Sequence, residues 1–174
     1  MGPPAPAGAP ARLMRSPVAV SVRPVDLAAF FTAASIGLDL EATRREEVLD
    51  RMVALLGVTG RQRATLLRLL ARREVLGSTG VGRGIAIPHC RSLVVPRVRM
   101  AYGRLRTPLP WDAPDDEPIR HVFLIVAPPV EVSNQFLPAL GRLARVAREG
   151  ASVAALERAT TPAEVLAALG ALGG

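Results

Sequence analysis

The residues around His89 suit covalent phosphoryl chemistry. Gly80, Gly82 and Gly84 alternate with other residues, and a short apolar run ending in Pro88 leads directly to His89. A neutral imidazole nitrogen can attack phosphorus, and the exposed backbone N–H groups of a glycine-rich loop can hold phosphate oxygens. Because the chain has only two histidines, we interpret this segment as a candidate phosphoryl-acceptor site.

Arginines flank this histidine in the sequence. Arg72 and Arg73 end the predicted helix that precedes the glycine-rich segment, and Arg91 follows His89 by two positions. A guanidinium group can bind two phosphate oxygens at once through its parallel N–H groups. The attacking ring nitrogen must be unprotonated, so we expect the imidazole of His89 to titrate near or below neutral pH.

Other chemistries fit the sequence less well. The glycines give G-x-G-x-G rather than the G-x-G-x-x-G of a dinucleotide-binding loop, and the absence of a following G-K-[ST] excludes a Walker loop. His89 and Cys90 are adjacent and lack partners at metal-ligand spacing, so we expect no metal and no cofactor. Neighbouring strand side chains point to opposite faces, which makes Cys90 a poor partner for His89. His121 lies inside an apolar run and is expected to be a core or sheet-face histidine.

Composition narrows the class of protein. The chain has 174 residues and a net charge of +7, and all 22 basic residues are arginine. The arginines are scattered and few aromatic residues are present to stack bases, so we expect a solvated basic surface and no nucleic acid partner. The single cysteine excludes a disulfide within the chain. No apolar run reaches the roughly 20 residues that span a bilayer, and no signal core is found, so we expect no membrane insertion and a cytoplasmic location.

The hydrophobic pattern predicts one mixed α/β domain with a central sheet flanked by helices. Residues 1–23 alternate proline with alanine and glycine and are expected to form a disordered tail, followed by a domain over residues 24–172. A capping box at Thr43-Arg44-Arg45-Glu46 and a second start at Thr59 predict two helices before Gly77. Strands are predicted at 85–89, 98–106 and 119–127, and the last of these should be buried on both faces. Later helices are predicted from 136 or 137 to 149, over 153–158, and from the Thr161-Pro162-Ala163-Glu164 start.

These residues together resemble a known family. Arg73-Glu74, Ser78-Thr79-Gly80, Gly82, Gly84 and Ala86-Ile87-Pro88-His89 are similar to the phosphorylation-site motif of type-2 enzyme IIA domains. These domains form the fructose, mannitol and nitrogen-regulatory class of the phosphoenolpyruvate-dependent phosphotransferase system. The resemblance extends more loosely from about Val25 to Leu169.

The resemblance implies a function for each matching residue. His89 would accept a phosphoryl group from the carrier protein HPr and pass it on, and Arg73 would stabilise the phosphohistidine. The resemblance places Ser78 and Thr79 near the site, and the backbone amides of the loop add Gly80, Gly82 and Gly84 to the expected phosphate-binding set. The implied partners are an HPr-like phosphocarrier and either an enzyme IIB or a regulatory protein. The sequence shows no transporter membrane domain or linked sugar domain, which favours the standalone nitrogen-regulatory type.

One position departs from the family pattern. Many members carry a second histidine at the start of the late helix, close to the phosphorylated one, and the matching residue here is Phe136. A phenyl ring cannot form a hydrogen bond to imidazole or phosphate. Two alternatives to a phosphocarrier are therefore open: a regulatory binding module with the same fold, and a domain that keeps the fold but in which Phe136 disables transfer.

Overall fold

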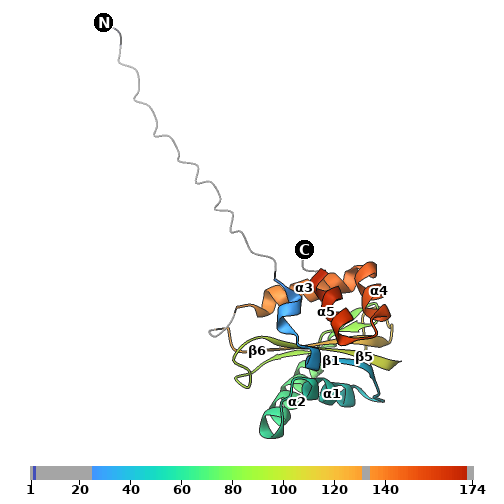
Figure 1. The fold of residues 1–174 in the computed structure, drawn as a ribbon. Helices are drawn as coiled ribbons and strands as arrows, with labels where there is room; N and C mark the ends of the chain where they lie inside the picture. The colour runs from blue at the N-terminus through green and yellow to red at the C-terminus, as the bar shows by residue number, and fades with distance from the viewer. Residues whose placement is uncertain (1, 3–24, 131–133, 172–174) are drawn as a thin grey trace.

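The computed structural model describes residues 2, 25–130 and 134–171 of the chain. The predicted tail, residues 1–23, lies outside these residues except for Gly2. Helices cover both faces of a central mixed sheet (Figure 1), which confirms the predicted α/β class. Its strands are β1 (Ile36–Leu40), β2 (Gly80–Gly82), β3 (Ile85–Ala86), β4 (His89–Arg91), β5 (Arg99–Leu109) and β6 (Ile119–Ala127).

The strand β6 organises the sheet. The order is β1-β5-β6-β3-β2, and β4 also pairs with β6. The strands β3 and β4 both run parallel to β6, whereas β5 pairs with β6 antiparallel and β1 pairs with β5 parallel. The run from Val122 to Ala127 is buried throughout, as expected for a strand with a helical layer on each face.

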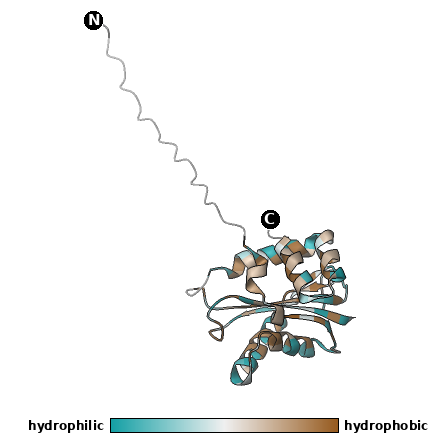
Figure 2. Cartoon of the chain, viewed as in Figure 1, coloured by the Kyte–Doolittle hydropathy of each residue, from teal (hydrophilic) through white to brown (hydrophobic). Residues whose placement is uncertain are grey.

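The two helical layers enclose separate apolar cores. One face carries α1 (Arg45–Leu55) and α2 (Gly60–Val75), and the other carries α3 (Phe136–Arg148), α4 (Gly150–Arg158) and α5 (Pro162–Ala171). Leu, Val, Ile and Ala dominate both cores, as the composition predicts. Hydrophilic residues gather on the outer part of α2, away from the sheet (Figure 2). Among the described residues, no helix is long and apolar enough to cross a membrane.

The first helix begins with a cap that is shifted by one residue from the prediction. The backbone N–H and the hydroxyl of Thr43 both donate to the carboxylate of Glu47, not to that of Glu46. A carboxylate here satisfies an N–H that has no partner within the helix. Of the later helices, α3 begins at Phe136 as predicted, whereas α4 begins three residues before Val153.

The predicted strand at 85–89 is divided in two. Proline lacks the N–H that a strand ladder requires, so the pairing with β6 is interrupted at Pro88. Ile87 donates instead to the carbonyl of Thr79, and Pro88 accepts from Ile125. The strand β4 resumes the pairing, with His89 as its first residue. The break therefore places His89 at the start of a short strand of its own.

Candidate functional site

Strand alternation in β4 determines what surrounds His89. His89 and Arg91 are half-buried on one face, and Cys90 points into the opposite core beneath α1 and α2. Burial raises the pKa of the Cys90 thiol to about 12, so this thiol is uncharged and unreactive at neutral pH. The expectation that Cys90 does not act together with His89 agrees with this geometry.

Hydrogen bonds fix both nitrogens of the His89 ring. Nδ1 lies 2.8 Å from the carbonyl oxygen of Ile87, and Nε2 lies 3.1 Å from Nε of Arg73. A carbonyl oxygen can only accept, so Nδ1 carries the hydrogen. Nε2 therefore has a free electron pair, which accepts the N–H of Arg73. This is the tautomer that a nucleophilic Nε2 requires.

The electrostatics around His89 favour this neutral form. Partial burial lowers the pKa of His89, and the positive charge of Arg73 lowers it further. The hydrogen bond to the Ile87 carbonyl opposes these effects in part. The net shift is downward from the ordinary value of 6.5. The ring is therefore predominantly neutral at pH 7, as the sequence analysis predicted.

The last turn of α2 positions Arg73. Leu66 and Leu70 anchor the helix in the core beneath the sheet. The guanidinium of Arg73 donates through Nη1 to the carbonyl of Gly77 at 2.8 Å as well as to His89. The next residue, Glu74, has a side chain only 6% exposed, and its carboxylate accepts from the N–H and the hydroxyl of Thr79.

An open pocket of about 310 Å³ lies over the His89 ring. The charged residues of its lining are all arginine. The complete lining is Leu69, Arg72, Arg73, Leu76, His89, Cys90, Arg91 and Phe136. The ring of Phe136 lies 5.6 Å from that of His89 at an angle of 48°. The expected proximity of this position to His89 is thus observed. The pocket can accept an anion next to a neutral nucleophile.

The predicted phosphate-binding residues lie in two places. Ser78 donates to the carbonyl of Trp111 at 2.6 Å and accepts from the N–H of Gly80, and Thr79 is bound to Glu74. These three residues therefore lie in the segment next to Ile87, whose N–H donates to the carbonyl of Thr79. The hydroxyl groups of Ser78 and Thr79 support the loop through bonds within the protein.

Gly82 and Gly84 lie elsewhere, because they form the tight end of the β2–β3 hairpin. Arg83 and Gly84 both have positive φ, 54° and 72°, as a two-residue type I′ turn requires. The carbonyl of Gly84 accepts from His121, whereas His89 pairs with Ile125. Four residues of β6 separate these points, or about 13 Å. The structure thus does not bring the amides of Gly82 and Gly84 to His89, and the turn accounts for Gly84.

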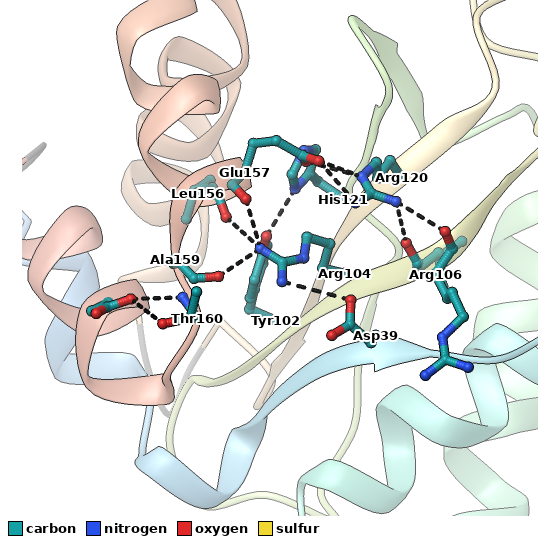
Figure 3. Close-up of polar contacts among 12 residues, drawn as sticks. Asp39, Tyr102, Arg104, Arg106, Arg120, His121, Leu156, Glu157, Ala159 and Thr160 are labelled. Carbon is teal, nitrogen blue, oxygen red and sulfur yellow. Dashed lines mark hydrogen bonds and ion pairs between the residues drawn. The ribbon is translucent and has the colours of Figure 1, made fainter.

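The second histidine is a buried sheet-face residue, as predicted. His121 is 3% exposed, its Nδ1 lies 2.8 Å from the Tyr102 hydroxyl, and its Nε2 lies 3.2 Å from the Glu157 carboxylate (Figure 3). Burial lowers its pKa to about 4. Because a carboxylate accepts only, Nε2 carries the hydrogen and Nδ1 accepts from Tyr102.

A buried arginine joins this network to the end of α4. Nη1 of Arg104 donates to the carbonyls of Leu156, Glu157 and Ala159 at 2.7–3.1 Å (Figure 3). These are carbonyls that have no partner within a helix. The sequence analysis missed this contact. The signal in the sequence was the occurrence of Arg104 and His121 next to the apolar residues of two predicted strands.

Within the described residues, no group of three or more histidine, cysteine, aspartate or glutamate side chains could hold a metal ion. The site consists instead of a neutral imidazole, an arginine on its free nitrogen and an open cationic pocket. These are the groups expected for transfer of an anionic group to nitrogen.

A family model described as "Phosphoenolpyruvate-dependent sugar phosphotransferase system, EIIA 2" matches residues 29–171. The chain belongs to this family. Enzyme IIA domains of this kind are phosphotransfer components of that system. The family membership agrees with the resemblance seen in the motif around His89.

Relatives of two kinds are similar to this enzyme IIA domain. A "Nitrogen regulatory protein" of Bradyrhizobium diazoefficiens is 32% identical over 63% of this chain and 72% of its own. A "PTS system fructose-specific EIIABC component" of Bacillus subtilis is 35% identical over 64% of this chain, which spans only 18% of that longer protein. The crystal structure of the nitrogen regulatory protein IIA-Ntr from Neisseria meningitidis superposes with a TM-score of 0.71 at 29% identity, over 82% of this chain and 98% of its own.

Proposed function

We propose that this domain is a phosphocarrier that accepts a phosphoryl group on Nε2 of His89 from an HPr-like carrier protein. One observation carries the proposal: the unprotonated Nε2 accepts from Arg73 at 3.1 Å, and both residues line an open cationic pocket. The downward shift of the His89 pKa keeps the electron pair of Nε2 available at neutral pH. Family membership supplies the class of reaction, and the geometry supports the atom that performs it.

The transfer step forms one N–P bond and breaks another. The electron pair of His89 Nε2 attacks the phosphorus of a phosphohistidine on the donor. The donor N–P bond breaks, and its electron pair stays on the donor nitrogen. His89 keeps the hydrogen on Nδ1, where the Ile87 carbonyl stabilises the positive charge that develops on the ring.

Arg73 has two successive roles in this proposal. Before transfer its Nε–H holds the ring with Nε2 directed into the pocket. Once Nε2 is bonded to phosphorus it can no longer accept, and the same N–H turns to a phosphate oxygen. Phosphoryl transfer depends mainly on positioning and charge neutralisation, so this arrangement needs no additional acid or base.

The phosphoryl group would then be passed on or serve as a signal. We favour the nitrogen-regulatory type, because two relatives with that name are matched over 72% and 98% of their own length. The name of the Bacillus relative includes B and C components beside A, which makes an enzyme IIB the partner to test for onward transfer.

A regulatory binding module is the second candidate function. One observation favours it: Phe136 stands at the pocket and offers no hydrogen bond to a phosphate. In that case phosphorylation of His89 would add about two negative charges to a cationic pocket and change which partner binds. Pull-downs with the wild type and with His89→Asp would distinguish the two, because a carrier without a switch would retain the same partners.

Incubation with phospho-HPr followed by intact-mass spectrometry tests the main proposal. The wild type should gain one phosphoryl group that is labile to acid and to hydroxylamine, and His89→Ala should gain none. His121→Gln is the matched control, since it removes the other imidazole. An active donor that leaves the wild type unmodified would overturn the proposal.

A further inference from the structure

Arg91 stands beside His89 on the same face of β4. Residues two apart on a strand share a face, and both side chains are half-buried and line the same pocket. Arg91 comes from β4, whereas Arg73 comes from α2. The pocket therefore receives guanidinium groups from two independent elements.

The ring of Phe136 holds this second guanidinium in place. Cζ of Arg91 lies 4.5 Å from the centre of the phenyl ring, and Nη1 donates to the carbonyl of Pro128 at 3.1 Å. Phe136 is 7% exposed, so the ring is itself fixed by the core. A planar guanidinium stacks on an aromatic face, which fixes its orientation at a small cost in entropy.

The remaining N–H groups of Arg91 are available to a ligand. Among the described residues, no carboxylate lies within ion-pair distance of Arg91, whereas Arg45, Arg63, Arg104, Arg106 and Arg120 all have one. A half-buried cation that has no counter-charge among the residues described, and that lines a pocket containing a nucleophile, is suited to an incoming anion.

We propose that Arg91 is a second phosphate-binding residue for the phosphoryl group on His89, and that Phe136 is the positioning residue that holds Arg91 over the pocket. This inference rests on the proposed function of His89. It also gives Phe136 a role: the phenyl ring offers no hydrogen bond to phosphate, and instead orients a cation that does.

Two phosphoryl donors separate this inference from the proposed carrier function. Phosphoramidate is a small donor that needs no protein docking. Its nitrogen is protonated by solvent, Nε2 bonds to its phosphorus, and the P–N bond breaks with its electron pair staying on the nitrogen, which leaves as ammonia. The rate of phosphohistidine formation and its hydrolysis half-life would be measured by mass spectrometry with phosphoramidate and with phospho-HPr. Thermal midpoints would confirm that each variant is folded.

Arg91→Gln should slow formation by about tenfold with either donor and shorten the half-life of the phosphohistidine, because one charge-assisted contact is lost. Arg97→Gln, which removes the same charge from an exposed position, is the control. Arg91→Lys keeps the charge without the planar fork and should show an intermediate loss. If Arg91→Gln does not fold, the rates and half-lives of Arg91→Lys test the role of Arg91 instead. Rates and half-lives within twofold of the wild type would overturn the role of Arg91.

Variants of Phe136 test the positioning role. Phe136→Leu should approach the loss of Arg91→Gln, and the double variant should lose little more, because both changes disrupt one unit. Phe136→Tyr keeps the aromatic face and should lose less than Phe136→Leu. Equal losses for Leu and Tyr, or additive losses in the double variant, would contradict positioning by the ring. Labelling by phosphoramidate but not by phospho-HPr would overturn only the carrier function, and no labelling by either donor would overturn both proposals.

Discussion

The two histidines of this chain lie against the same strand but differ in what their ring nitrogens meet. His121 belongs to β6 and is bonded on both sides to side chains, those of Tyr102 and Glu157. His89 is bonded to a backbone carbonyl on one side, and its other nitrogen shares an open pocket with Arg73. Burial lowers the pKa of both rings, so both are neutral at pH 7.

The comparison shows that neutrality alone does not make a nucleophile. The free electron pair of His121 is on Nδ1, where the Tyr102 hydroxyl already occupies it within the core. The electron pair on Nε2 of His89 also accepts a hydrogen bond, but its donor is Arg73, which lines the same open pocket. A structural imidazole differs from a reactive one in two respects: which nitrogen carries the hydrogen, and which group contacts the other nitrogen.

Substitution of each histidine in turn should give the largest difference in phosphorylation between the two regions. His89→Gln should abolish labelling by phospho-HPr, because no ring nitrogen is left at the pocket. His121→Gln should keep its label and instead lower the thermal midpoint, because it disrupts a buried network. Intact-mass measurements and thermal melts read the two effects, and a labelled His89→Gln protein would contradict the assignment.

Arg73→Gln should reduce the rate of phosphorylation by about 10²-fold, the usual effect of removing one pre-oriented donor. The His89 pKa should rise at the same time, because the positive charge of Arg73 helps to lower it. Rapid-quench labelling measures the rate, and an NMR titration of the imidazole measures the pKa. Arg68→Gln, on the exposed side of α2, is the control for charge. An unchanged His89 pKa would show that Arg73 does not act on the ring.

Acid should destabilise the fold through His121. Its pKa in the folded state is about 4, below the ordinary 6.5, so the unfolded chain binds the proton first as the pH falls. Stability is therefore lost between about pH 6.5 and 4, by about 3 kcal/mol from this residue at pH 4. Urea unfolding at several pH values should show a shallower decline for His121→Gln. Parallel declines would assign the acid sensitivity to other groups.

Tyr102→Phe should have the smallest effect, a loss of about 1–2 kcal/mol, because it leaves Nδ1 of His121 without a donor in a buried site. Labelling of His89 should be unchanged, since the two networks do not share a residue. Urea unfolding at pH 7 measures the loss. A slower phosphorylation rate would mean that the two regions are coupled through β6.

The sequence predicted elements whose signals are local. The strand β6, which contains a long apolar run, has the bounds 119–127 that were predicted. The start of α5 at Pro162 follows from helix-start chemistry. The strand β1 was missed because only part of it is buried and it contains Gly37 and Asp39, which are poor strand formers. The division between β3 and β4 lies at Pro88, a local signal that the predicted strand at 85–89 ran across.

In the site, the residues of the motif were predictable from the sequence, whereas the contacts made by packing were not. The pairing of Arg73 with His89 followed from the motif, because both residues are part of it. The role of the glycines was less accessible, since a glycine needed for a hairpin turn has the same sequence signature as one needed for an anion loop. The stacking of Arg91 on Phe136 joins residues 45 positions apart, and only the packing of α3 on the sheet brings them together.

The hydrogen bonds from Thr79 to the Glu74 carboxylate have a kinetic consequence. Arg73 lies in the last turn of α2, which is followed by the highly exposed Leu76, and terminal helical turns open far more often than a whole domain unfolds. Each opening would carry Arg73 away from His89. The bonds from Thr79 to Glu74 oppose that opening. They therefore increase the fraction of time for which Arg73 is bonded to His89. An encounter with a phosphoryl donor would be productive only during that fraction.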